Sequence, residues 1–133
     1  MPLRWTIDSE TRKVDIVAEG DVTADDARAF FDCIEAAGVL NFDKLIDGTR
    51  GRAAMSPEEL IGVAVRIRSQ HEMSAVGALA VVMRRDQSEN MIRILGAAAV
   101  AKRPMKVFDE IAPARRWLDG VSRKLSVAGS PGP

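Results

Sequence analysis

The chain has 133 residues, of which 47% are hydrophobic and 29% are charged, a composition that is ordinary for one globular domain. Nineteen basic residues balance nineteen acidic ones, which argues against a protein that binds nucleic acid or an anionic membrane through a basic excess. Cys33 is the only cysteine, which excludes an internal disulfide and a cysteine-rich zinc site. With no signal-peptide pattern and no apolar run of membrane-spanning length, we expect a cytoplasmic protein without a membrane span.

The first part of the chain predicts a hairpin followed by an amphipathic helix. Apolar and polar residues alternate from Leu3 to Asp8 and again from Val14 to Glu19, which is typical of two half-buried antiparallel strands. Thr23 and Asp26 have the spacing of a capping box, so they predict the start of a helix over Ala24–Ala37. Gly38 is suited to end that helix.

The next segment predicts a short strand, a glycine loop and a second helix. Lys44–Asp47 is the strand, and Gly48–Arg52 is predicted as a tight loop because it contains two glycines. Ser56 has the position of an N-cap, with proline and two glutamates directly after it. We expect the helix to run to about Gln70.

The apolar side of this second helix is wider than packing on one sheet face requires. It comprises Leu60, Ile61, Val63, Ala64, Val65 and Ile67. Arg68 lies within the same arc, which leaves two interpretations open. Either Arg68 extends past its neighbours to solvent, or the helix also contacts a second surface such as another subunit in a homodimer.

Val76–Met83 is a run of eight residues without a polar side chain, which predicts a strand buried on both faces. Asp86 is suited to cap a following helix over Gln87–Ala101. Met105–Phe108 predicts a fifth strand, with Asp109 as a cap, and Glu110–Asp119 predicts a last helix that Gly120 ends.

These elements predict one α/β domain over residues 1–120, with a disordered tail over residues 121–133. The order is strand, strand, helix and then three strand–helix units. Alternating strands and helices favour right-handed crossovers. We therefore expect a single five-stranded mixed sheet that is mostly parallel, with four helices and an antiparallel hairpin at one edge.

This order of elements resembles the STAS superfamily, which includes bacterial anti-sigma-factor antagonists and the cytoplasmic domains of sulfate-type anion transporters. The chain is also similar to small uncharacterised bacterial proteins described as STAS-like or lipid-transfer-like. The segments that carry this likeness are Leu3–Asp8, Ala18–Gly20, Lys44–Asp47, Met105–Phe108 and Arg116–Leu118.

The resemblance implies a STAS-like fold and a protein partner such as a kinase or a sigma-factor regulator. In the antagonists, a kinase phosphorylates a serine or threonine just after the third strand. The corresponding region here is Asp47–Glu59, where Ser56 is the nearest match, but the sequence is Met-Ser-Pro-Glu rather than Asp-Ser-Ser-Gly-like. Two nearby glutamates would repel a phosphate on Ser56, so a helix cap is the simpler role for this serine.

The sequence offers no complete set of catalytic or metal-binding residues. His71 is the only histidine and has no second histidine to form a ligand pair. Cys33 has no basic neighbour in the sequence, so we expect it to pack rather than react. Asp47 ends a strand but has no evident acid or base to work with. We therefore expect no catalytic residues, no metal and no cofactor.

One group of polar residues follows from the expected topology. If the third strand and the central strand are parallel neighbours, Thr49, Arg50 and Arg52 approach Arg84 and Arg85 near the helix start at Ser56. Such an edge would favour a small anion, a phosphorylated group or an acidic patch on a partner. The alternative is that these arginines pair locally with Asp47 or Asp86.

We therefore expect a non-enzymatic regulatory or protein-interaction domain that docks its partner through Thr49, Arg50, Arg52, Ser56, Arg84 and Arg85. The second hypothesis is a carrier or sensor of a lipid or another apolar small molecule, held between helix and sheet. The wide apolar side of the second helix and the lipid-transfer-like relatives suggest this hypothesis. A small hydrolase-type enzyme that uses Asp47 is third.

Overall fold

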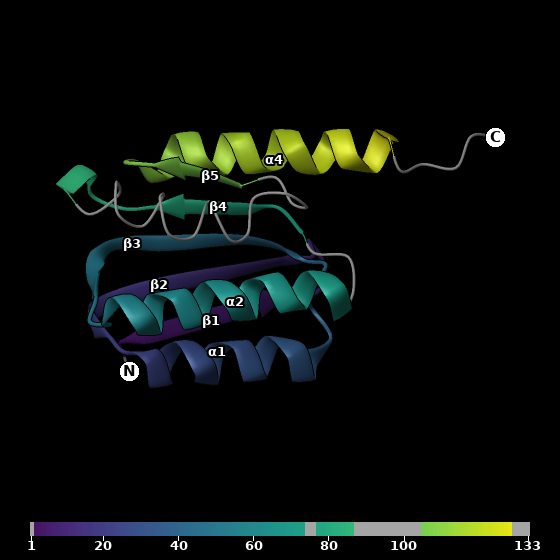
Figure 1. The fold of residues 1–133 in the computed structure, drawn as a ribbon. Helices are drawn as coiled ribbons and strands as arrows, with labels where there is room; N and C mark the ends of the chain where they lie inside the picture. Colours follow the sequence, from purple (N-terminus) through teal and green to yellow (C-terminus); the bar gives the residue numbers. More distant parts are fainter. Residues whose placement is uncertain (1, 74–76, 87–104, 129–133) are drawn as a thin grey trace.

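The computed structural model describes residues 2–73, 77–86 and 105–128 (Figure 1). Within these residues the chain forms, in order, β1 (Leu3–Asp8), β2 (Lys13–Val22), α1 (Ala24–Ala37), β3 (Asp43–Ala53), α2 (Pro57–Met73), β4 (Leu79–Val82), β5 (Met105–Phe108) and α4 (Ile111–Ala128). The described residues thus contain three helices where the sequence predicted four. The helix predicted at residues 87–101 lies outside them.

The five strands form one sheet in the order β1-β2-β3-β4-β5. β1 pairs with β2 in the antiparallel sense, and the three further pairs are parallel. The prediction of a five-stranded mixed sheet with an antiparallel hairpin at its edge is confirmed.

Helices cover both faces of this sheet, with α1 and α2 on one side and α4 on the other (Figure 1). The alternation of side chains along β4 explains its apolar sequence. Leu79 and Val81 pack with Ile46 on the face of α1 and α2, whereas Ala80 and Val82 pack on the face of α4. The prediction of an interior strand buried on both faces is confirmed, although the strand itself covers only Leu79–Val82.

β3 is longer than predicted, because the segment Gly48–Arg52 is strand and not loop. Its extension pairs with β2 as far as Val22, which lies beside Ala53. At Gly51 a Cβ atom would lie 2.6 Å from the Cβ of Ala18, so a side chain would force the two strands apart. Glycine here permits close contact between strands rather than a turn, and this is why the loop prediction was wrong.

The predicted ends of α1 and the predicted start of α2 are confirmed. Thr23 and Asp26 form the reciprocal hydrogen bonds of a capping box, and Gly38 ends α1 in the left-handed conformation at φ 70°. At α2, Ser56 Oγ accepts from the backbone N–H of Glu59 at 3.1 Å, and the Glu59 carboxylate accepts from the Ser56 N–H at 2.9 Å. α2 begins at Pro57 as predicted and runs to Met73, slightly beyond the predicted end.

The last helix is also longer than predicted, since α4 continues through Gly120 to Ala128. An internal glycine costs a helix only about 1 kcal/mol relative to alanine. Val121, one residue further, packs against the core on this face and favours continuation. The division into a domain over residues 1–120 and a tail stays a prediction.

Candidate functional site

The polar residues predicted to gather at one end of the sheet are Thr49, Arg50, Arg52, Ser56, Arg84 and Arg85, and we call them the arginine rim. β3 and β4 are parallel neighbours in which Asp47 lies beside Val82. A Cβ atom on Gly48 would lie 3.9 Å from the Cβ of Met83. Thr49, within β3, and Arg84, shortly after β4, therefore lie toward the same end of the sheet, where α2 also begins (Figure 1).

Two rim arginines lie toward opposite sides of this end. β3 continues along β2 beyond the end of β4, so Arg52 lies beside Asp21 of β2 and pairs with it at 2.6 Å. Arg85 instead pairs at 2.7 Å with Asp109, directly after β5. The two arginines thus have acidic partners on opposite sides of β3 and β4, and the rim as a common binding surface stays a prediction.

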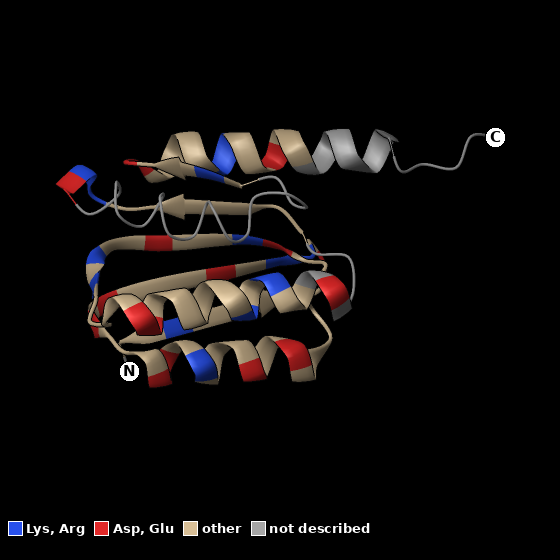
Figure 2. Cartoon of the chain, viewed as in Figure 1, with Lys and Arg blue, Asp and Glu red and all other residues tan. Residues whose placement is uncertain are grey.

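Carboxylates accompany the arginines of the rim. Besides the pairs of Arg52 and Arg85, Arg84 lies 3.4 Å from Asp86. Figure 2 shows acidic residues beside basic ones at this end of the sheet. Arg50 is exposed and makes no ion pair within the described residues. Exposed pairs of this kind contribute little stability, but they offset the positive charge that would attract a free anion.

Thr49 and Asp47 form a local turn-like contact within β3. The Thr49 hydroxyl donates to Asp47 Oδ1 at 2.7 Å, and the Thr49 backbone N–H donates to the same oxygen at 3.1 Å. These two bonds hold the carboxylate against its own strand. The Asp47 carboxylate thus has a structural role in the local backbone conformation.

Ser56 has the cap role described above, and its side chain is half-buried. Its hydroxyl stands at the start of α2, the position that the antagonist resemblance implies for a modified serine. Glu58 and Glu59 follow directly. Phosphorylation of Ser56 stays a prediction.

The other single residues considered for chemistry have packing contacts or lie outside the described side chains. Cys33 is half-buried, and its Sγ accepts a hydrogen bond from the Trp5 indole at 3.3 Å. His71 belongs to α2, but its side chain lies outside those that the structure describes. No group of three or more His, Cys, Asp or Glu residues in the described part of the chain has the geometry to hold a metal ion.

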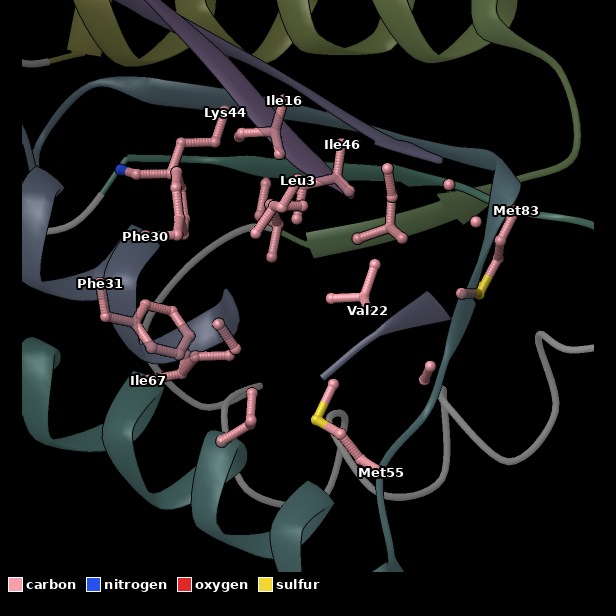
Figure 3. A pocket seen from close by; sticks show the side chains of 18 of the residues that line it. Leu3, Ile16, Val22, Phe30, Phe31, Lys44, Ile46, Met55, Ile67 and Met83 are labelled. Carbon is pink, nitrogen blue, oxygen red and sulfur yellow. The ribbon is translucent and has the colours of Figure 1, made fainter. Parts of the chain in front are cut away.

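The structure also contains an apolar cavity between the sheet and the helices α1 and α2. Its volume is about 180 Å³. Figure 3 shows side chains from the sheet, such as Leu3, Ile16 and Ile46, on one side and Phe31 and Ile67 from the helices on the other. The space is partly open to solvent and is not a sealed void of the core.

Small residues of β2 and β3 leave the space beneath the beginning of α2. Ala18, Gly48, Gly51 and Ala53 all line the cavity together with Leu60 of α2. The second hypothesis from the sequence placed an apolar ligand between a helix and the sheet, and this cavity lies between the sheet and the helices α1 and α2. The signal that was available is the combination of small residues in β3 with the wide apolar side of α2.

Three residues that line the cavity have polar side chains, and each of them bonds to the protein itself. Lys44, only 4% exposed, donates to the backbone carbonyls of residues 39, 40 and 42 at 2.8–3.3 Å. Figure 3 shows its nitrogen at the far end of the side chain from Ile16. Gln70 donates to Glu35, and Arg52 pairs with Asp21. The cavity therefore presents an apolar surface.

A polar clamp joins α1 to α2 beside this cavity. The Arg66 guanidinium donates to Glu35 at 3.0 Å and to Asp32 at 2.7 Å. Gln70 donates to the same Glu35 oxygen at 2.9 Å. The hydrogen bond from Arg66 holds the pKa of Glu35 below its usual value, burial opposes this effect, and Gln70 adds to it. The clamp keeps the two helices together over the sheet.

Comparison with known proteins agrees with this architecture. The family model described as SpoIIAA-like matches residues 14–119. No curated protein matches the sequence. None of the helices that the structure describes is long and apolar enough to span a membrane.

Two solved structures have a similar fold. One is an uncharacterised protein of the DUF3478 family with a SpoIIAA-like fold from Shewanella loihica PV-4, with a TM-score of 0.61 and 18% identity over 87% of this chain and 93% of its own. The other is an anti-sigma factor antagonist from Mycobacterium paratuberculosis, with a TM-score of 0.57 and 13% identity over 88% of this chain and 94% of its own. The resemblance found in the sequence is confirmed, and the chain belongs to the SpoIIAA-like family.

Proposed function

We propose that this chain is a non-enzymatic, cytoplasmic regulatory domain that binds an apolar small molecule between its sheet and the helices α1 and α2. The observation that carries this proposal is the cavity of about 180 Å³ with its apolar lining. An engineered apolar cavity of about 150 Å³ in another protein stays dry and binds benzene. A cavity of this size is thus large enough for a small apolar ligand.

The lining defines the chemistry of the ligand. The three polar side chains of the lining, Lys44, Gln70 and Arg52, already donate hydrogen bonds to acceptors of the protein. A charged group of a ligand among the apolar side chains would therefore find no available hydrogen-bond partner. Burying such a group costs several kcal/mol. An uncharged hydrocarbon or a short aliphatic chain with one weakly polar end fits this environment.

The test is calorimetric titration with n-hexanol, n-octanol and n-decanol. We expect saturable binding of at least one of these alcohols and a negative heat-capacity change, since apolar surface is buried on binding. Ala27→Leu fills the cavity from α1, and Ala53→Leu fills it from β3. Both variants should lose binding, whereas Ala36→Leu on the exposed side of α1 should keep it.

Circular dichroism and thermal unfolding identify any variant that fails to fold, and the other filling variant then decides. No saturable binding to the wild-type chain by any of the three alcohols would overturn the proposal. Equal binding by Ala36→Leu and a folded filling variant would overturn the assignment to this cavity.

A second candidate function is docking of a protein partner on the arginine rim, the surface predicted from the sequence. It is favoured by side chains from β3, the start of α2 and the segment after β4 that lie at one end of the sheet. Arg52, Arg84 and Arg85 are each more than half exposed even though each has an acidic neighbour. An acidic partner could exchange for these neighbours at little cost.

The test uses the whole chain as bait in quantitative pull-down experiments. The rim variant carries alanine at Arg50, Arg52, Arg84 and Arg85. A control of equal charge change carries alanine at Arg28, Lys106, Arg115 and Arg116, which are exposed on α1, β5 and α4. Proteins retained by the wild type and the control but lost by the rim variant would support this function, and identical retention by all three would overturn it.

A further inference from the structure

The outer side of α2 carries a stripe of four exposed residues, Glu58, Ile61, Val65 and Arg68, which we call the outer stripe. Their spacing of three, four and three residues places them within an arc of about 80° on an α-helix. The cavity lies on the opposite side of α2, where Leu60, Val63 and Ile67 line it. The outer stripe is therefore a separate surface.

Ile61 and Val65 are unusual because the other large apolar side chains whose burial the structure describes are buried or half-buried. Ile61 is 55% exposed and Val65 is 59% exposed. They lie one helical turn apart, so they form one patch. Beside them Gly62 leaves open space, with no atom within 4 Å of where a Cβ would be. A second helix could therefore approach closely here.

The charges at the two ends of this patch determine which partner fits. Glu58 precedes Ile61 by three residues, and Arg68 follows Val65 by three, so the outer stripe is symmetric in spacing about Val63 and opposite in charge at its ends. Neither Glu58 nor Arg68 makes an ion pair within the described part of the chain. An antiparallel copy of the same helix places Glu58 opposite Arg68 twice and Ile61 opposite Val65 twice.

A parallel copy does not fit, because it places Glu58 opposite Glu58 and Arg68 opposite Arg68. Like charges that face one another destabilise a helix pair. The antiparallel pair has twofold symmetry, which is the usual symmetry of a homodimer. Glu72, one turn further, would then lie beyond the start of the partner helix and remain in water.

We propose that the outer stripe is a self-association surface on which a second copy of this chain docks, with the two α2 helices antiparallel. The apolar pairs supply the attraction, and the charge pairs fix the direction. A single helix pair buries less area than a standard interface, so the dissociation constant should lie between about 1 µM and 1 mM. The proposal is independent of ligand binding in the cavity.

Sedimentation equilibrium over the range of about 10 µM to 1 mM tests it directly. The wild-type chain should show a monomer–dimer equilibrium. Glu58→Arg and Arg68→Glu should each weaken dimerisation by about tenfold, since each replaces two attractive pairs by two repulsive ones. The double variant E58R/R68E should restore it, and Glu10→Arg, at an exposed position in the turn after β1, should have no effect.

The apolar part is tested by the double variant I61A/V65A, which keeps a high helix propensity and should be monomeric. Circular dichroism checks that every variant is folded. A wild-type chain that stays monomeric at the highest concentration would overturn the proposal. Dimerisation unaffected by I61A/V65A would also overturn it, as would single charge variants that behave like the wild type, because the latter result indicates another surface or a parallel pair.

Discussion

α1 and α2 lie side by side on the same face of the sheet (Figure 1). They differ in how many of their large apolar side chains are buried in the core. α1 buries Phe30, Phe31 and Ile34, each less than 10% exposed, and its outer side is charged. α2 buries Ala64 and Ile67 toward the sheet and yet leaves Ile61 and Val65 exposed on the other side.

This difference between the two helices indicates that α2, rather than α1, carries residues for binding. Every large apolar residue of α1 has a place in the core, so folding alone accounts for the helix. α2 has apolar residues that folding does not use, and its first turns lie over the small residues of β3, where the cavity remains. Both proposed contacts, with an apolar ligand and with a second copy, therefore involve α2.

The largest expected effect is the loss of a core side chain from α1. Ile34→Ala should lower the free energy of unfolding by about 2–5 kcal/mol, because Ile34 is 1% exposed and its removal leaves a cavity. Urea unfolding monitored by circular dichroism measures this change. A loss below about 1 kcal/mol would show that α1 is not anchored in the core as described.

The clamp between the two helices should have the next largest effect. Glu35→Gln should lower the free energy of unfolding at neutral pH by about 1–2 kcal/mol, because Arg66 and Gln70 both donate to the carboxylate. The pKa of Glu35 is lowered in the folded chain, mainly by Arg66, so its contribution is present above the unfolded pKa and is lost as the pH falls through the folded pKa.

The stability difference between the wild type and Glu35→Gln should therefore shrink as the pH falls below the ordinary glutamate pKa of about 4.3. Thermal unfolding at a series of pH values measures it. Asp25→Asn provides a control on the same helix, because Asp25 pairs with Arg28 on the exposed side. A difference between wild type and Glu35→Gln that stays constant into acid would show that the clamp is not ionic.

The helix caps should have smaller effects that are equal in the two helices. Thr23→Ala and Ser56→Ala should each cost about 1 kcal/mol, since each removes an oxygen that accepts from the first turn. Ser9→Ala in the exposed β1–β2 turn is the control and should be nearly neutral. If unfolding experiments find Ser56→Ala as neutral as Ser9→Ala, the capping role of Ser56 is wrong.

The smallest expected effect on the monomer is that of Ile61→Ala. At 55% exposure, this change should alter the free energy of unfolding by about 0.5 kcal/mol or less when measured in dilute solution, where the chain is monomeric. Ile34→Ala and Ile61→Ala are the same substitution in the two helices, so their effects can be compared directly. Equal losses for the two variants would remove the distinction between α1 and α2.

Much of the fold could be predicted from the sequence because its signals are local. The ends of the helices are marked by Thr23, Gly38 and Ser56, whose hydrogen bonds reach only a few residues along the chain. The apolar composition of the run that ends at Met83 is sufficient to predict a buried strand. Gly51 could not be interpreted correctly in this way, because its role depends on Ala18, which is distant in the sequence.

The candidate site was less predictable for the same reason. The common end of β3 and β4 followed from the expected topology, but the ion pairs of Arg52 and Arg85 depend on Asp21 and Asp109, which lie on strands or turns distant in the chain. A cavity depends on side chains from several elements that do not fill the space between them. The wide apolar side of α2 suggested a ligand between helix and sheet, but the periodicity of one segment does not show whether a space remains there.

The most direct test of the central claim is a crystal structure determined under xenon pressure, since xenon enters apolar cavities that are empty of water. We expect a xenon atom between the sheet and α2, in contact with residues such as Ile16, Val63 and Val81 that line the cavity. A structure with no xenon in this space, because side chains or ordered water fill it, would contradict the claim that the domain holds an apolar ligand there.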